Sequence, residues 1–298
     1  MISGFSIIRN GDKLGYPYIE ALKSLAPVVD ELVIAVGDND DSTYESLRAL
    51  APQLPCPVKF VDSPWDPKSM KGGLELSRQT NVALDHCQYD VCFYIQADEG
   101  LDEREYDTIR RDLQRFAEDP SVDALSFHWR HFYGNFTYVI ANRKWYRKEA
   151  RVIKKSSGLR SYGDAQGFRI PQVNGTWRKG RAALSSAHVN HYGWVRPIAT
   201  MIAKTNSFNR LWHGDTAKKV TDQDLLYVKQ FGVRKFRGEL PSLIRERAKQ
   251  LEGYDPFAAQ KITDWAQYLS LWSADLVERL TGWRIGEYSS YKYVKKYP

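Results

Sequence analysis

The sequence predicts an α/β fold with a mainly parallel sheet. Over residues 1–130, short apolar runs alternate with amphipathic helical segments, which is typical of βαβ units. Polar clusters directly follow several of the apolar runs, as expected where buried strands end at one edge of a sheet. The length of 298 residues suits one large domain, or one domain with a substantial extension.

Each expected element has its own pattern. The strands are short runs of β-type residues, and the second, over 31–36, reads as a buried strand. The helices place apolar residues three and four positions apart, and turns rich in Gly, Pro, Asp and Ser separate the elements. In chain order we predict strands over 4–8, 31–36, 58–61, 90–95 and 124–131, and helices over 19–29, 43–50, 74–86 and 106–116.

Beyond Trp129 the pattern changes. Up to residue 196 the chain is dense in Trp, Tyr, Arg, Lys and Gly, which favours sheet edges and loops shaped around a ligand. We therefore expect a ligand-binding domain over 1–196 and a helical C-terminal extension over 197–298. The expected helices of this extension cover 198–211, 222–231 and 264–280, and an aromatic, basic tail covers 288–298.

Composition narrows the class of protein. The formal charge is +7, which favours an anionic partner such as a phosphorylated small molecule, a nucleic acid or a lipid surface. No apolar run approaches the ~20 residues needed to cross a bilayer, and the first residues do not read as a secretory signal. We expect a cytoplasmic protein, with peripheral membrane association through the basic tail as a further possibility.

Polar side chains follow three of the predicted strands. Arg9 and Asn10 follow the first, Asp38 and Asp40 follow the second, and the fourth ends in Gln96-Ala97-Asp98-Glu99. In an open parallel sheet these ends meet at one edge, which is where ligands bind. A carboxylate there can hold a hard cation that bridges phosphates, and Asp98 suits this role.

The ordered set of motifs resembles a known family. SIIRN, ELVIAVGDNDDST, GGLELSRQTNVAL and DVCFYIQADE resemble, in this order, the inverting family-2 glycosyltransferases of GT-A fold. In that family the same order reads as the first strand, an acidic nucleotide-binding turn, a Gly-rich segment leading to an Asn-bearing helix, and a D-x-D strand end. The resemblance covers roughly residues 4–135.

The resemblance implies a nucleotide-sugar donor, UDP- or GDP-linked, and Mn²⁺ or Mg²⁺. It implies that Asp98 binds the metal with the diphosphate. Gln96 stands on the first acidic position of D-x-D, so one carboxylate is replaced by a neutral amide. A late histidine often completes the metal shell in GT-A enzymes, and His191 resembles that element. The implied nucleotide-binding residues are Arg9, Asn10, Asp38, Asp40, Gly73, Asn81 and Gln96.

Inverting glycosyl transfer also needs a base near the acceptor hydroxyl. Asp164 is the first candidate, because the glycines around it allow a close approach to a ligand. Glu99 is the second, since it adjoins the expected metal, and Glu149 is the third. An ordinary turn aspartate is an equally good interpretation of Asp164.

Two other classes compete with a glycosyltransferase. A sugar nucleotidyltransferase needs a Gly-rich basic loop after the first strand, where this chain has only Arg9-Asn10-Gly11-Asp12. A nucleic-acid-binding protein fits the charge, but carboxylates at the binding edge would repel phosphates. We therefore expect no nucleic-acid partner. The acceptor stays open between polysaccharide, lipopolysaccharide core, glycolipid and protein.

Overall fold

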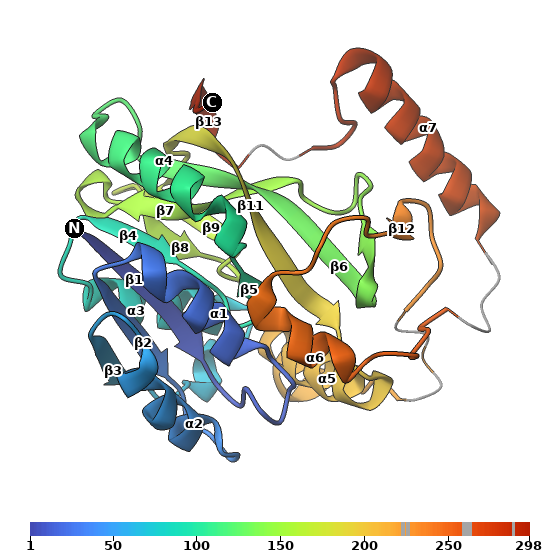
Figure 1. The fold of residues 1–298 in the computed structure, drawn as a ribbon, viewed down its shortest axis with the longest axis horizontal. Coiled ribbons are helices and arrows are strands. Elements are labelled where there is room, and N and C mark those ends of the chain that lie inside the picture. The colour runs from blue at the N-terminus through green and yellow to red at the C-terminus, as the bar shows by residue number, and fades with distance from the viewer. Residues whose placement is uncertain (222–223, 225–226, 258–263, 288–289) are drawn as a thin grey trace.

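The computed structural model describes residues 1–221, 224, 227–257, 264–287 and 290–298. It has a large mixed sheet flanked by helices, together with a small three-stranded sheet (Figure 1). The strands are β1 (Ile2–Ile8), β2 (Glu31–Val36), β3 (Val58–Asp62), β4 (Val91–Tyr94), β5 (Glu99–Gly100), β6 (Ala124–Ile140), β7 (Lys148–Lys154), β8 (Arg160–Tyr162), β9 (Gly167–Pro171), β10 (Trp177–Arg178), β11 (Arg181–Val195), β12 (Val233–Lys235) and β13 (Lys292–Lys296).

Helices connect and cover these strands. The main α-helices are α1 (Tyr18–Leu25), α2 (Thr43–Leu50), α3 (Leu74–Asp85), α4 (Tyr106–Glu118), α5 (Ile198–His213), α6 (Arg245–Lys249) and α7 (Trp265–Thr281). None of the helices in the described ranges combines the length and hydropathy that crossing a bilayer requires.

The large sheet confirms the predicted α/β class. Its order is β13-β11-β6-β7-β4-β1-β2-β3, with β5 on β11 and β12 on β6. The neighbours β4, β1, β2 and β3 are all parallel to one another, as are β6, β11 and β13. β7, which joins the two groups, runs antiparallel to its neighbours β4 and β6, and the short strands β5 and β12 pair antiparallel with β11 and β6. This is the arrangement expected of a GT-A fold.

Both faces of the sheet are covered, which explains the continuous apolar runs. In β2, Leu32 and Ile34 face a core formed with α1 and α4. Val33 and Ala35 face the opposite core, formed with α3. Because successive side chains of a strand point to opposite faces, a strand buried on both sides shows no alternation.

The second half of the chain differs from the prediction. The segment expected to be mainly loops and sheet edges contains β6, β7 and β11, which form the centre and one flank of the large sheet. The helix expected over 222–231 falls partly outside the described residues, and 227–231 is irregular. Helices α5 and α7 were predicted, whereas β12 and β13 return from the expected extension to the main sheet.

The C-terminal tail over 288–298 was expected to be exposed for contact with a membrane, but part of it is packed into the fold. Its residues 292–296 form the edge strand β13, while Tyr291 and Tyr297 are buried on either side of that strand. Residues 288–289 lie outside the described ranges. Large exposed apolar side chains lie instead on α7, which stands apart from the sheet in Figure 1; they include Trp265, Leu269, Trp272, Leu276 and Leu280.

Candidate functional site

Three parallel strands bring the predicted site residues to one edge of the sheet. β1 lies between β2 and β4 and is parallel to both, so their carboxyl ends share an edge. Strand spacing separates the ends of β2 and β4 by about 10 Å. We call this edge the rim: residues 9–16 after β1, 37–43 after β2 and 95–99 after β4.

The loop after β1 is bound to the acidic turn after β2. Arg9 donates from Nε to the carbonyl of Asp38 at 3.0 Å and from Nη2 to its carboxylate at 2.9 Å. Asn10 accepts from the backbone N–H of Asp40 at 3.0 Å, and Lys13 pairs with the Asp40 carboxylate. The rim therefore brings four of the predicted nucleotide-binding residues together.

Trp65 belongs to the rim as well, and the sequence reasoning missed it. Its backbone N–H donates to Asp38 Oδ1 at 3.1 Å, and the Arg9 guanidinium lies 5.1 Å from its ring centroid. Partial burial favours a higher pKa for Asp38, but the Trp65 N–H and Arg9 outweigh it and lower this pKa. The available signal was an aromatic residue in the loop that follows the third strand.

The end of β4 carries a buried ion pair. Glu99 accepts from Arg151 Nη2 at 2.7 Å and Nε at 2.9 Å, and both side chains are at most 1% exposed. Glu99 also accepts from the backbone N–H of Gln96 at 3.0 Å. Both oxygens of this carboxylate are buried and hydrogen-bonded to Arg151, which argues against the expectation that it is a base.

Asp98 lies beside His191, as the sequence predicted, but a lysine stands with them. Lys204 Nζ donates to Asp98 Oδ2 at 3.0 Å, and His191 Nε2 lies 3.9 Å from the same oxygen. Antiparallel pairing of β5 with β11 places Glu99 opposite His191 and brings the segment after β4 against β11. Gly193 makes room for the group, because a Cβ there would lie 2.9 Å from Asp98 Oδ2.

A second histidine orients His191. His131 Nε2 lies 2.7 Å from the carbonyl of Tyr146, so this nitrogen carries the hydrogen. Burial lowers the pKa of His131 well below its usual value, so the ring is neutral and its Nδ1 is an acceptor. His191 Nδ1, 3.0 Å away, is then the donor. This tautomer leaves a lone pair on His191 Nε2, on the side of Asp98.

The residues around Asp98 do not fit a divalent cation. One carboxylate faces two cations, Lys204 and Arg196, whose charges lower the pKa of Asp98 despite its burial. Burial and Arg196 lower the pKa of Lys204 to about 8, so it remains charged at neutral pH. Among the residues that the structure describes, no three His, Cys, Asp or Glu side chains are grouped to hold a metal. Mn²⁺ or Mg²⁺ would need several oxygen ligands and negative charge.

Asp164 lies in a strained turn that contacts the rim. Gln96 Nε2 donates to the carbonyl of Ala165 at 3.1 Å, which joins the turn to the end of β4. Ala165 has a φ of 61°, a conformation that costs a non-glycine residue about 1–2 kcal/mol. In the described part of the chain, only Ala165 and Asn10 combine a positive φ with a side chain. Strain at a site-facing turn is typical of functional positions.

Gly73 fits closely beneath that turn. Its φ is +73°, and an added Cβ would lie 2.8 Å from Asp164 Cβ and 3.1 Å from Asp164 Cα. The neighbouring Gly72 also has a positive φ, but its Cβ would meet nothing within 4 Å. Gly73 therefore leaves room for the Asp164 turn, and its contact with the nucleotide stays a prediction.

Asn81, which the resemblance implies to bind the nucleotide, is hydrogen-bonded within the protein. Its amide donates to the carbonyl of Ser161 at 2.9 Å and accepts from the Ser161 N–H at 2.9 Å. Both hydrogen-bonding groups of the side chain are thus used to attach β8 to α3. We assign Asn81 to holding the base of the Asp164 turn, which follows β8.

Replacing Gly73 by alanine tests this packing, with Gly72→Ala as the matched control. Both variants place alanine at a positive φ and should lose about 1–2 kcal/mol of unfolding free energy. Gly73→Ala should lose a further ~1–3 kcal/mol, because the new methyl group overlaps Asp164. Denaturant unfolding of both variants measures the difference. Equal losses would mean that the Asp164 turn moves aside freely.

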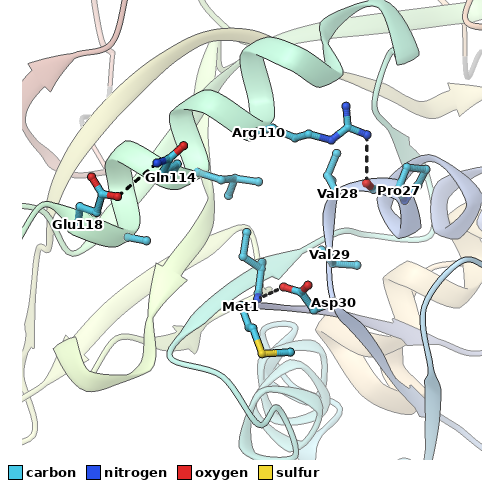
Figure 2. A pocket seen from close by; sticks show the side chains of 11 residues that line it. Met1, Pro27, Val28, Val29, Asp30, Arg110, Gln114 and Glu118 are labelled. Atoms are coloured by element: carbon cyan, nitrogen blue, oxygen red, sulfur yellow. Dashed lines mark hydrogen bonds between the residues drawn. The ribbon is translucent and has the colours of Figure 1, made fainter.

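A pocket lies at the opposite end of the strands. It has a volume of about 410 Å³ and is lined by the start of β1, residues 27–30 and α4 (Figure 2). Its polar groups already have partners: Asp30 accepts from the N–H of Ile2 at 2.6 Å, and Arg110 donates to the carbonyl of Pro27 at 3.2 Å. Because ligands of open α/β sheets bind at the carboxyl ends of strands, we place the site at the rim.

Comparison with known proteins gives partial structural similarity only. No protein-family model and no curated protein matches the chain. S. aureus TarS, residues 1–349, in complex with UDP matches with 17% identity and a TM-score of 0.37, over 55% of this chain and 51% of that one. Glucosyl-3-phosphoglycerate synthase from Mycobacterium tuberculosis, in complex with Mn²⁺, UDP and phosphoglyceric acid, matches with 15% identity and a TM-score of 0.30, over 43% of each chain. The matches span about half or less of those structures.

Proposed function

We propose that this chain is a glycosyltransferase that takes a sugar from a nucleoside-diphosphate donor. The observation that carries the proposal is the convergence at the rim. The acidic turn after β2, the Asp98 cluster after β4 and the Asp164 turn meet there. The acidic turn and the strand end that carries Asp98 come from segments that resemble the family-2 motifs and follow their order. A nucleotide-sugar donor has a base at one end and a sugar at the other, so it needs an extended site with different polar groups along its length.

The nucleoside end of the donor is assigned to the acidic turn. Asp38 is used in fixing Arg9 and Trp65, so its role is to shape the pocket. Asp40 is exposed and paired only at the surface with Lys13, which leaves it able to reach a ribose hydroxyl. Across about 10 Å of the rim, the diphosphate then reaches the region of Asp98.

The reacting sugar is assigned to the space facing Asp164. In an inverting transfer, the acceptor oxygen bonds to the anomeric carbon while the bond from that carbon to the diphosphate oxygen breaks. The carboxylate of Asp164 takes the proton of the acceptor hydroxyl. The electron pair of the broken bond stays on the nucleoside diphosphate, which leaves with added negative charge.

The acceptor and the transferred sugar are part of the proposal. We propose a hexosyl group and a glycan or lipid-linked acceptor, since the family resemblance points to polysaccharide and glycolipid synthesis. Membrane contact through the tail would not involve Tyr291 and Tyr297, which are buried. Its lysines 292, 295 and 296 remain exposed and are the groups that an anionic surface would meet.

Nucleotide binding tests the function directly. UDP or GDP at 100 times its dissociation constant should stabilise the fold by about 2.7 kcal/mol, which appears as a higher melting temperature. Asp40→Asn should reduce the shift, whereas the control Asp107→Asn, which changes an exposed carboxylate on α4, should leave it unchanged. A screen of UDP- and GDP-sugars for donor hydrolysis then identifies the donor. Stabilisation by an oligonucleotide and by neither nucleotide would reject the proposal in favour of nucleic-acid binding.

A further inference from the structure

Two cations near the rim, one buried and one partly buried, have more hydrogen-bond donors than acceptors. Arg196, at the end of β11, is 2% exposed, and its Nε and Nη2 have no hydrogen-bond partner among the described residues. Only Nη1 is used, on the carbonyl of Gly193. A buried donor without a partner costs free energy, more so when it is charged. The Nε and Nη2 groups of Arg196 therefore lack an acceptor within the described part of the chain.

The second cation is Lys204 on α5. Its ammonium donates to Asp98 Oδ2 at 3.0 Å and to the carbonyl of Gly193 at 2.7 Å. Arg196 shares that carbonyl, so the two cations lie side by side. Asp98 balances only one of their charges. The pair thus carries one uncompensated positive charge in a buried place, which an anion would neutralise.

The loop after β1 connects this pair to the nucleoside end of the rim. The Arg196 guanidinium lies 4.8 Å, and the Lys204 ammonium 5.2 Å, from the ring centroid of Tyr16. The same loop contacts the acidic turn through Arg9 and Lys13. A ligand that extends from the acidic turn along this loop would reach the two cations.

We propose that Arg196 and Lys204 form a diphosphate-binding site that works without a divalent cation. That the natural ligand is the diphosphate of a sugar donor rests on the proposed function. The unpartnered guanidinium N–H groups and the ammonium donate to phosphate oxygens, as charge-assisted hydrogen bonds. When the bond from the anomeric carbon to the diphosphate breaks, the added charge on the leaving oxygen is stabilised by these two cations. Asp98 positions Lys204.

Calorimetric titration in chelator-treated buffer tests the site, with inorganic pyrophosphate, UDP, GDP, uridine and guanosine as probes. The wild type should bind pyrophosphate with EDTA present. Lys204→Met should weaken binding of pyrophosphate and of the matching nucleotide by about 10- to 100-fold, and should leave the corresponding nucleoside unaffected. Lys204→Arg should retain most of the affinity. The control Lys219→Met changes an exposed lysine outside the site and should behave as wild type.

The outcomes separate this site from the proposed function. Pyrophosphate binding that is lost in Lys204→Met supports the site, even where neither UDP nor GDP binds and the glycosyltransferase proposal fails. Nucleotide binding that requires Mn²⁺ and is unchanged in Lys204→Met overturns the site and leaves the function standing. If Lys204→Met does not fold, pyrophosphate binding by the wild type is measured with and without EDTA. Loss of binding in EDTA would overturn the proposal, and unchanged binding in EDTA would support it.

Discussion

Glu99→Gln is expected to lower the free energy of unfolding by about 3–5 kcal/mol, the usual cost of removing one partner from a buried ion pair. The neutral amide leaves the Arg151 guanidinium, 1% exposed, without its counter-charge. Arg151 has aromatic neighbours, with the Trp129 ring centroid 4.6 Å from the guanidinium, so water cannot replace the lost carboxylate. Denaturant unfolding measures the loss.

Two further variants make this result specific to the pair. Glu45→Gln, on exposed α2, is the matched control and should change stability by less than about 0.5 kcal/mol. The double variant Glu99→Leu with Arg151→Met removes both charges and should recover much of the stability, because apolar replacement of a whole buried pair is often neutral. A Glu99→Gln variant as stable as the wild type would contradict the closed, desolvated pair.

Asp164→Asn is expected to reduce kcat by roughly 10²- to 10⁴-fold, the usual contribution of a general base. The amide keeps the shape of the side chain and its contact with the backbone N–H of Gln166, but it cannot take a proton. Binding of the nucleotide should persist, since the acidic turn and the two cations are unchanged. Steady-state kinetics with the donor identified in the hydrolysis screen, together with nucleotide titration, measures both quantities.

The size of the effect distinguishes a base from a turn aspartate. Asp107→Asn, which changes a fully exposed carboxylate on α4, is the control and should retain full kcat. A turn aspartate would show a loss of stability with kcat largely kept, and that result would remove Asp164 from the reaction. Melting temperatures of both variants therefore accompany the kinetics.

The N-terminal half of the fold was predictable because each of its strands shows a pattern within its own residues. β1, β2 and β4 are buried on both faces, so each is a mainly apolar run that ends at a polar cluster. β6 was expected to end at residue 131 but extends to Ile140. It continues because β11 and β12 pair with it, and such pairing partners leave no local pattern in the strand itself.

The site was predictable where it depends on strand ends and not where it depends on partners. Asp98 could be placed from its position at a strand end, and His191 from the family resemblance. Lys204 could not, since it lies 106 residues from Asp98 on α5, where a lysine has no distinguishing signal. The sequence likewise suggested that Glu99 is an accessible carboxylate, because its ion-pair partner Arg151 is 52 residues away in the chain.

The edge strand β13 has a practical consequence for anyone who handles this protein. It pairs parallel with β11 from Arg181 onward and ends two residues before the C-terminus, with lysines along its exposed length. Shortening the chain before residue 290 would uncover the unpaired N–H and C=O groups of β11, a ready template for intermolecular strand addition. Shortened versions should therefore be checked for oligomers by size-exclusion chromatography.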